Sequence, residues 1–278
     1  MINLAMTLLV ASGVAFDQRL DQALGLLGKG DPSAAGHLIA IGLPAAHSIE
    51  GYLRDPKVEV RRAAVLALEG IGGAESCSLL AAPLADLSLE IRGRAALAIY
   101  RRCPRANLPC PQLIEGLHMP DPSAAAILLG GYCHEAKGIL QKPLTGNLKL
   151  EAYGPLVRGG LVASVSLLRL GDRSQTGILA NAVKSQSLAE TEFILQVLPD
   201  IANPRLAMPM LDDLRETGFA SNSPAGAKQP RRICDIAADL LADRVEVKLP
   251  FDRKPFGRYT AQQLQLAKAA IAKKLPPV

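Results

Sequence analysis

Histidine, cysteine and carboxylate side chains are the groups that could bind a metal or catalyse a reaction, but their spacing builds no site. The 278-residue chain holds four histidines and five cysteines. The cysteines form no C-x-x-C pair, and their separations do not match the ligand spacings of zinc sites. No P-loop, G-x-S-x-G or H-E-x-x-H motif occurs. We therefore predict a protein with no cofactor, no metal and no enzymatic activity of its own.

Two of the cysteines differ from the others because prolines flank them. Cys103 and Cys110 lie in the segment RRCPRANLPCP, whose prolines discourage a helix there. A chain that turns between two helices can bring such positions to the Cα separation of ~5.5 Å that a disulfide needs. If the chain is exported, we expect a disulfide between Cys103 and Cys110. The remaining cysteines are then expected to be small core residues: Cys77, Cys133 and Cys234.

The elements that carry these residues are expected to be helices. Ala and Leu dominate the hydrophobic residues, which make up 49% of the chain, whereas aromatic residues make up 4%. Ala and Leu are strong helix formers, while aromatic and β-branched residues favour strands. The composition therefore favours packed helices, with no sheet beyond an isolated pair of short strands.

An internal repeat organises these helices. The segment from Asp55 to Arg61 (DPKVEVR) aligns without gaps with the segment from Asp86 to Arg92 (DLSLEIR), at an offset of 31 residues. The flanking apolar residues also align, and they place Leu66 and Leu97 in the expected core. Each unit has the pattern of a helix, a turn that begins with Asp, and a second helix. Because one helix pair cannot bury its own apolar face, we expect neighbouring pairs to stack.

This pattern resembles the HEAT repeat, in the short bacterial form also seen in phycobilisome-lyase-like proteins. The resemblance is close over residues 31–102 and weaker over residues 110–217. It implies an all-α solenoid of stacked antiparallel helix pairs, a HEAT-like superhelix. In such repeats the turn Asp and the following Arg often bond between neighbouring units. The resemblance therefore implies a structural ladder of four residues: Asp55, Arg61, Asp86 and Arg92.

A stacked-helix surface of this kind suits a non-catalytic module for protein–protein interaction or a scaffold, with a protein as its partner. One alternative is an enzyme, or an enzyme subunit, of the lyase-like HEAT group that acts on a tetrapyrrole. Another is a nucleic-acid-binding HEAT protein, but 31 basic residues are spread among 26 acidic ones, which favours a mixed solvated surface. The family of deoxyhypusine hydroxylase binds iron with four His-Glu dipeptides, and this chain has only His134-Glu135.

The start of the chain predicts a targeting segment. An apolar run from Leu4 to Val10 is followed by small residues, so we interpret residues 1–15 as a candidate secretory signal peptide. No Lys or Arg precedes the run, and an apolar first helix of the fold is the alternative. On balance we favour a periplasmic or secreted protein over a cytoplasmic one, and expect no membrane span in the mature chain. The rest divides into a repeat solenoid at 16–218, an exposed loop at 219–230 and a C-terminal helical cap at 231–278.

Overall fold

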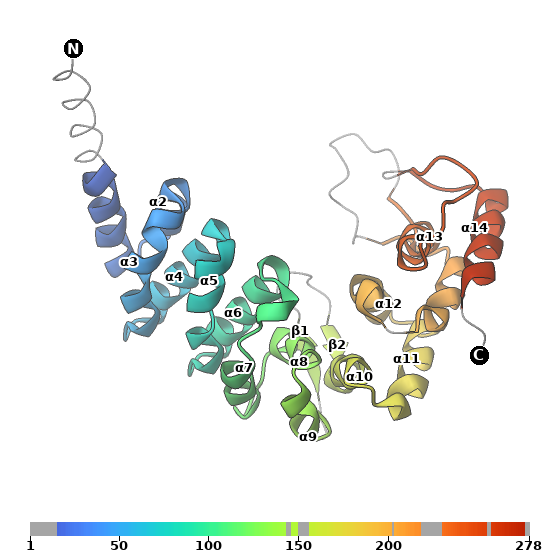
Figure 1. Ribbon diagram of the computed structural model, residues 1–278, viewed down its shortest axis with the longest axis horizontal. Coiled ribbons are helices and arrows are strands. Elements are labelled where there is room, and N and C mark those ends of the chain that lie inside the picture. Colours follow the sequence, from blue (N-terminus) through green and yellow to red (C-terminus); the bar gives the residue numbers. More distant parts are fainter. Residues whose placement is uncertain are drawn as a thin grey trace, which may run out of the picture. The chain divides into compact units, whose positions relative to one another are not determined.

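The structure, a computed structural model, describes residues 16–142, 146–149, 156–201, 203–217, 230–254 and 257–275. The candidate signal peptide, residues 1–15, lies outside the described residues, as do residues 219–229 of the expected loop. Within the described ranges the regular structure is almost entirely helical (Figure 1). The prediction of an all-α fold of stacked helix pairs is therefore confirmed. None of the helices in these ranges is long and apolar enough to span a bilayer.

The chain divides into two compact units, Met1–Cys133 and His134–Val278. Within the second unit the backbone N–H of Ile233 donates to the carbonyl of Arg215 at 2.9 Å, which joins the start of α13 to the segment after η8. The division into a solenoid at 16–218, a loop at 219–230 and a cap at 231–278 stays a prediction.

The first unit is a series of helix pairs. Residues 16–28 form a helix that is followed by α2 (Ala34–Ile41). The next pairs contain η1 (Leu43–Ala45), α3 (Ala46–Ile49), η2 (Glu50–Arg54) and α4 (Val58–Ile71), then α5 (Gly73–Leu79), η3 (Ala82–Ala85) and α6 (Leu89–Arg102). After η4 (Arg105–Asn107), the unit ends with α7 (Cys110–Leu117) and α8 (Ala124–Gly130).

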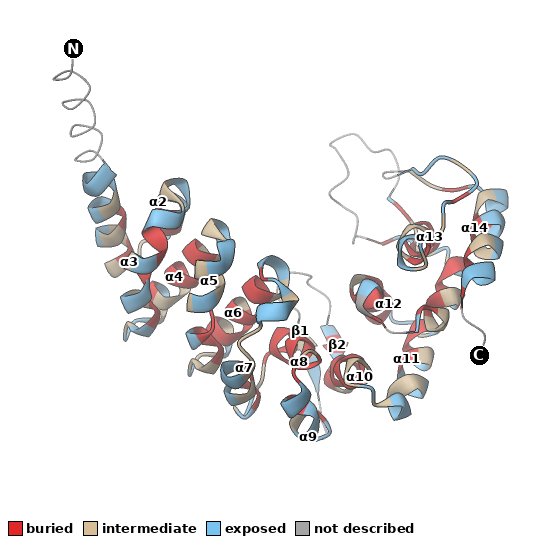
Figure 2. Cartoon of the chain, viewed as in Figure 1, coloured by how far each residue is buried: buried red, intermediate tan, exposed pale blue. Residues whose placement is uncertain are grey.

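The second helices of these pairs form the centre of the first unit. The helices α2, α4, α6 and α8 pack in succession, and their buried residues face their neighbours (Figure 2). Ala64 and Leu68 on α4 are fully buried, as are Ala95 and Ile99 on α6. Small alanines at the contacts let the helices approach closely, and the leucines and isoleucines supply the apolar area.

Two leucines test the expected core. Leu97 is buried as expected, but Leu66 is only half-buried, because its position on α4 lies at the edge of the packed face.

Two glycines end the helices that precede them. Gly42 and Gly72 follow α2 and α4 with φ values of 82° and 69°, a left-handed conformation that glycine adopts without steric cost.

Aspartates at turns in both units hold the backbone through the same local bond. The carboxylate Oδ1 accepts a hydrogen bond of 2.7–3.1 Å from the backbone N–H two residues later, as seen at Asp31, Asp55, Asp86, Asp172 and Asp213. At Asp31, Asp55 and Asp86 this Asx turn satisfies an N–H group just before α2, α4 and α6 begin. The recurring Asp is therefore explained by local hydrogen bonding, in both units.

The second unit continues the pattern with more irregular first helices. It contains η5 (His134–Ala136), α9 (Lys137–Leu140), β1 (Asn147–Lys149), β2 (Leu156–Arg158), α10 (Gly159–Arg169), η6 (Arg173–Gln175) and α11 (Thr176–Val183). These are followed by α12 (Leu188–Val197), η7 (Leu198–Asp200), η8 (Pro204–Asp212), α13 (Ile233–Arg244) and α14 (Ala261–Lys274). The strands β1 and β2 pair antiparallel, with Leu148 opposite Val157. They form the isolated pair of short strands that the composition allowed.

Candidate functional site

The ladder expected from the turn residues begins at Arg61 on α4. Its Nε and Nη2 atoms donate to the Asp86 carboxylate at 2.7 and 3.1 Å, and its Nη1 donates to the carbonyl of Asp55 at 2.9 Å. Arg61 therefore bonds to its own turn and to the turn of the next helix pair. Asp55 takes part through its carbonyl, because its carboxylate Oδ1 accepts the N–H of Lys57 at 2.8 Å.

Arg92 occupies the equivalent position on α6 and forms the next step. Its Nη1 donates to the carbonyl of Asp86 at 2.7 Å, and its Nη2 donates to the carbonyl of Asp121 at 2.6 Å. The Arg92 side chain is buried, so its charge is stabilised by carbonyl dipoles of two successive turns. The structure thus brings Asp55, Arg61, Asp86 and Arg92 into one continuous network along the turns.

A groove lies beside this network. Its volume is about 430 Å³, and it opens between the turns that follow η2 and η3. It is lined by Leu53, Arg54, Asp55, Pro56, Arg61, Ala82, Pro83, Ala85, Asp86 and Leu87. The Arg61 guanidinium is occupied by Asp86 and by carbonyls of the first turn. The groove therefore offers a ligand apolar side chains, such as Pro83 and Leu87, together with the exposed Arg54.

Leu87 is the most unusual residue of this groove. Its side chain is 90% exposed, although leucine is normally buried. It follows the turn Asp86, where the corresponding residue of the preceding turn is Pro56. The Asx bond from the Ser88 N–H to Asp86 holds the backbone on which Leu87 stands, at 2.7 Å. The turn therefore presents an apolar side chain to solvent in a fixed position.

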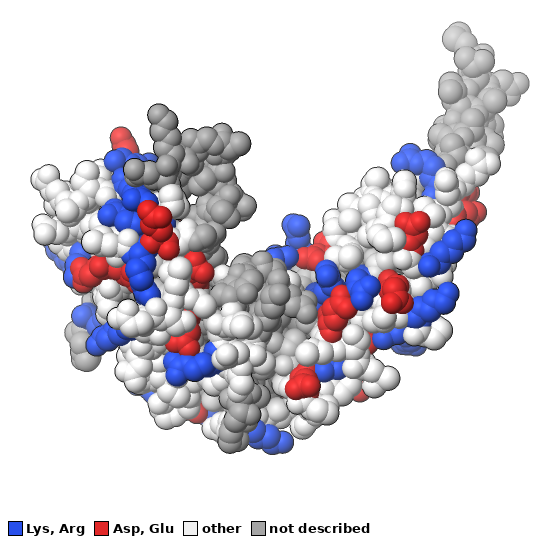
Figure 3. All heavy atoms as spheres, turned by 180° about the vertical axis from the view of Figure 1, so that it is seen from behind, with Lys and Arg blue, Asp and Glu red and all other residues white. Residues whose placement is uncertain are grey.

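Charged side chains cover the adjoining face of α4 and α6, but they neutralise one another. Arg62 Nη2 donates to Glu90 at 2.8 Å, Arg94 reaches the same carboxylate at 3.3 Å, and Arg101 pairs with Glu69 at 3.2 Å. The hydrogen bond from Arg62 holds the pKa of Glu90 below its usual value, against the opposing effect of burial. Basic and acidic side chains are likewise interspersed on the face seen in Figure 3. Among the described residues drawn in Figure 3, neither sign of charge forms a continuous patch of its own.

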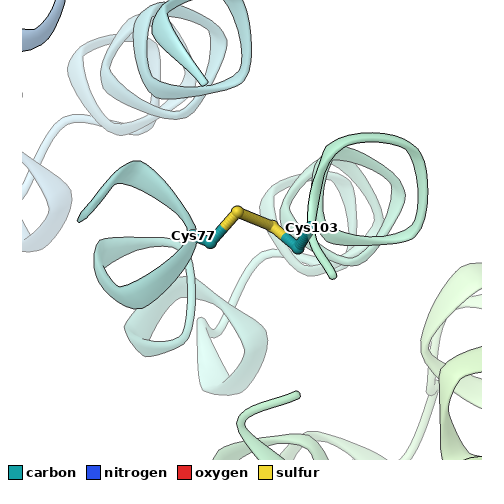
Figure 4. Close-up of a disulfide and its surroundings, with 2 residues drawn as sticks. All are labelled: Cys77 and Cys103. Atoms are coloured by element: carbon teal, nitrogen blue, oxygen red, sulfur yellow. A yellow bond between two sulfur atoms is a disulfide. The ribbon is translucent and has the colours of Figure 1, made fainter. Parts of the chain in front are cut away.

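The cysteines pair differently from the sequence prediction. Cys77 bonds to Cys103, as Figure 4 shows, and Cys110 bonds to Cys133, with Cα–Cα separations of 5.7 Å in both pairs. The predicted Cys103–Cys110 bond is therefore wrong, and Cys77 and Cys133 are not free core thiols. Cys234 is the buried free thiol that was expected.

The physical reason lies in the antiparallel helix pair. Such a pair brings its first helix beside the end of its second helix, so each bridge joins positions 26 or 23 residues apart. The loop between Cys103 and Cys110 joins two different pairs, and each of its ends is bonded within its own pair. Cysteine separations near the length of one helix pair were the signal that sequence reasoning missed.

A second polar cluster, also missed from the sequence, lies at the start of α13. The buried Asp235 accepts hydrogen bonds from the Arg232 guanidinium at 2.9 and 3.0 Å and from the Tyr259 N–H at 3.0 Å. The Tyr259 hydroxyl donates to Asp239 at 2.6 Å, and Arg231 donates to the same carboxylate. These bonds attach the irregular segment before α14 to α13.

This cluster stabilises the fold, and neither its tyrosine nor the nearby Cys234 is suited to catalysis. Burial, together with the bond to Asp239, raises the pKa of Tyr259 to about 12, and burial raises the pKa of Cys234 to about 11. Neither group is therefore poised to donate or accept a proton at neutral pH. The Phe251 ring packs edge-on against Tyr259, with 5.0 Å between centroids. These two rings therefore pack against each other within the second unit.

Among the described residues, no three His, Cys, Asp or Glu side chains gather as a metal site.

Comparison with known proteins supports the fold. No family model matches the sequence, and no curated protein gives a significant match. Among solved structures, the chain is similar to a chain in the complex of CpcE and CpcF of phycocyanin lyase from Nostoc sp. PCC7120. The TM-score is 0.52 and the identity 16%, over 92% of this chain and 94% of that chain. At this identity the likeness shows the fold alone, a helical-repeat arrangement of the HEAT-like kind.

Proposed function

We propose that the chain is a protein-binding helical-repeat module that carries out no reaction itself, and that its partner docks at the groove beside Leu87. The observation that carries the proposal is the 90% exposure of a leucine on a rigid turn. Covering such a side chain contributes roughly 2 kcal/mol, which a partner gains only if it reaches this position. Contiguous exposed apolar surface and grooves mark binding sites, and Leu87 adjoins such a groove.

The surroundings of Leu87 suit a protein partner. The exposed Leu89 lies two residues further along, and the adjacent Pro56 is exposed on the other side of the groove. Paired charges surround this apolar strip, which matches the apolar centre and polar rim of protein interfaces. Nucleic acid is a poorer match, because Arg61 and Arg62 beside the groove are engaged with carboxylates and leave Arg54 as the exposed arginine of its lining.

The test compares Leu87→Asp with wild type in chemical cross-linking within the native cell, followed by purification and identification of what is cross-linked. We expect the variant to lose the partner at an unchanged melting temperature, because the side chain contributes little to the folded state. Leu156→Asp is the matched control, since Leu156 is 57% exposed but lies on β2 in the other unit. A partner that binds both variants as well as wild type rules out the groove.

A second candidate function is a subunit of an enzyme that acts on a tetrapyrrole. The observation that favours it is the likeness to a chain of the phycocyanin lyase complex over 92% of this chain. Absorption spectra of the purified protein with an open-chain tetrapyrrole test this function, with and without an acceptor protein. A shifted and narrowed absorption band, or a covalently coloured acceptor, would favour this function over the scaffold. An unchanged spectrum and an uncoloured acceptor would rule out this second candidate function.

A further inference from the structure

The two disulfides occupy matching places in consecutive helix pairs. Cys77 on α5 and Cys110 on α7 lie on first helices, while Cys103 and Cys133 lie just after the second helices α6 and α8. Each bond therefore joins the first helix of a pair to the end of its second helix, over 26 and 23 residues. The same connection made twice in succession uses four of the five cysteines of the chain.

The bonds occur where the repeat changes its length. The turns at Asp86 and Asp121 are 35 residues apart, against 31 for the turns at Asp55 and Asp86, because the loop between α6 and α7 adds residues. The helices α5, α7 and α8 have only seven or eight residues. Helices of two turns are marginal by themselves, so a covalent link adds to the stability that packing supplies.

Aromatic contacts fix the same junction. Arg105, in the loop between the bridged cysteines, places its guanidinium 4.4 Å from the ring centroid of Tyr100 and 5.1 Å from that of Tyr132. Tyr100 lies three residues before Cys103, and Tyr132 immediately precedes Cys133. Arg105 contacts both rings only while Tyr100 and Tyr132 keep the positions that the neighbouring disulfides at Cys103 and Cys133 hold.

The fifth cysteine does not compete with these pairs. Cys234 is buried on α13 in the other unit. Burial raises its pKa to about 11, so almost none of it is thiolate, the form that attacks a disulfide. Oxidation of this chain can therefore give one set of disulfides, Cys77–Cys103 and Cys110–Cys133, while Cys234 stays a thiol.

We propose that this protein matures in an oxidising compartment, outside the reducing cytosol, and that the two disulfides are structural staples of helix pairs α5–α6 and α7–α8. Forming each bond removes two protons and two electrons from two thiols. A disulfide-carrying oxidoreductase accepts them: its disulfide forms a mixed disulfide with one cysteine, the second cysteine displaces it, and the oxidoreductase leaves as a dithiol. Cytosolic thiol systems would run the exchange in the opposite direction.

The location is tested on protein recovered from its native cell. Free thiols are trapped with N-ethylmaleimide during fractionation, and the peptides are mapped without reduction. We expect the protein in the extracytoplasmic fraction, with Cys77 linked to Cys103 and Cys110 linked to Cys133, and with Cys234 alkylated only after denaturation. Protein confined to the cytosolic fraction, free thiols at the four paired positions, or a Cys103–Cys110 bond would each overturn the proposal.

The staple role is tested on the purified full-length protein. We expect the double variants Cys77→Ser/Cys103→Ser and Cys110→Ser/Cys133→Ser each to lower the melting temperature by about 5–10 °C, whereas Cys234→Ala changes it little. If a double variant fails to fold, titrating the wild type with dithiothreitol gives the same measurement on the native sequence. A wild-type melting temperature that does not respond to reduction would overturn the role. Binding measured with Leu87→Asp is independent of both results.

Discussion

Arg61 and Asp86 lie in neighbouring helix pairs, and the Arg61 Nε donates a hydrogen bond of 2.7 Å to the Asp86 carboxylate. Their side chains are only 15% and 8% exposed, so the pair is largely removed from water. Asp86 also holds its own turn through the Ser88 N–H. One carboxylate thus stabilises the turn within a helix pair and the contact between two pairs, which is where the stability of a stacked repeat resides.

We expect Asp86→Ala to destabilise the first unit by about 2–4 kcal/mol, because it removes the one carboxylate that both the buried Arg61 charge and the Ser88 N–H bind. A double-mutant cycle with Arg61→Ala, measured by urea unfolding, should give a coupling energy of about 1–3 kcal/mol. The more exposed pair of Arg101 and Glu69 provides the control, with an expected coupling below about 1 kcal/mol. Equal coupling in the two cycles would contradict this prediction.

Gly116 on α7 allows a close approach to the preceding helix pair. A Cβ at this position would lie 2.3 Å from the carbonyl oxygen of Leu84, which is backbone and cannot rotate away. We expect Gly116→Ala to cost about 1–3 kcal/mol, since α7 must move. Gly36→Ala on α2 is the control: nothing lies within 4 Å of its added Cβ, so the better helix former should be neutral or stabilising by up to about 1 kcal/mol. A Gly116→Ala variant as stable as Gly36→Ala would show that α7 does not need this contact.

The buried Asp235 gives the second unit a specific response to acid. Burial raises the pKa of Asp235, but the hydrogen bonds from Arg232 and from the Tyr259 N–H outweigh it and leave the pKa below its usual value. A carboxyl whose pKa is lowered by folding contributes stability above its unfolded pKa of about 4, and this contribution is lost as the pH falls through the folded pKa. We therefore expect wild type to be more stable than Asp235→Asn at pH 7, and the difference to shrink below about pH 4. Urea unfolding of both proteins between pH 7 and pH 2.5 measures it. A difference that stays constant over this range would be inconsistent with the lowered pKa.

Leu68 lies on the packed face of α4, and Leu66 lies at the edge of that face. Leu68 is fully buried, whereas Leu66 is half-buried. We expect Leu68→Ala to destabilise by about 2–4 kcal/mol, because it leaves a cavity between helices, and Leu66→Ala by less than about 1.5 kcal/mol. Thermal unfolding of the two variants gives the comparison directly. A larger loss at Leu66 would place the core on the face that the sequence repeat, rather than the structure, indicates.

Several features follow from the sequence because they are local or join neighbours. The Asp turn recurs because its carboxylate bonds to an N–H two residues away. The Ala and Leu content and spacing indicated the helical class, the 31-residue offset aligned the turns at Asp55 and Asp86, and the resemblance to HEAT repeats implied that Arg61 bonds between them. Each of these depends on contacts within one helix pair or with the next one.

The tertiary structure decided what depends on which side chains meet across helices. Cys103 and Cys110 are close in sequence, but the antiparallel packing of each pair turns them toward Cys77 and Cys133. The Asp235 cluster joins residues 24 apart through an irregular segment that has no repeat pattern to predict it. Leu87 belongs to an apolar pattern in sequence, yet it lies on a turn that no neighbouring helix covers. Periodicity reports which residues share a face of a helix, but burial and pairing depend on what packs against that face.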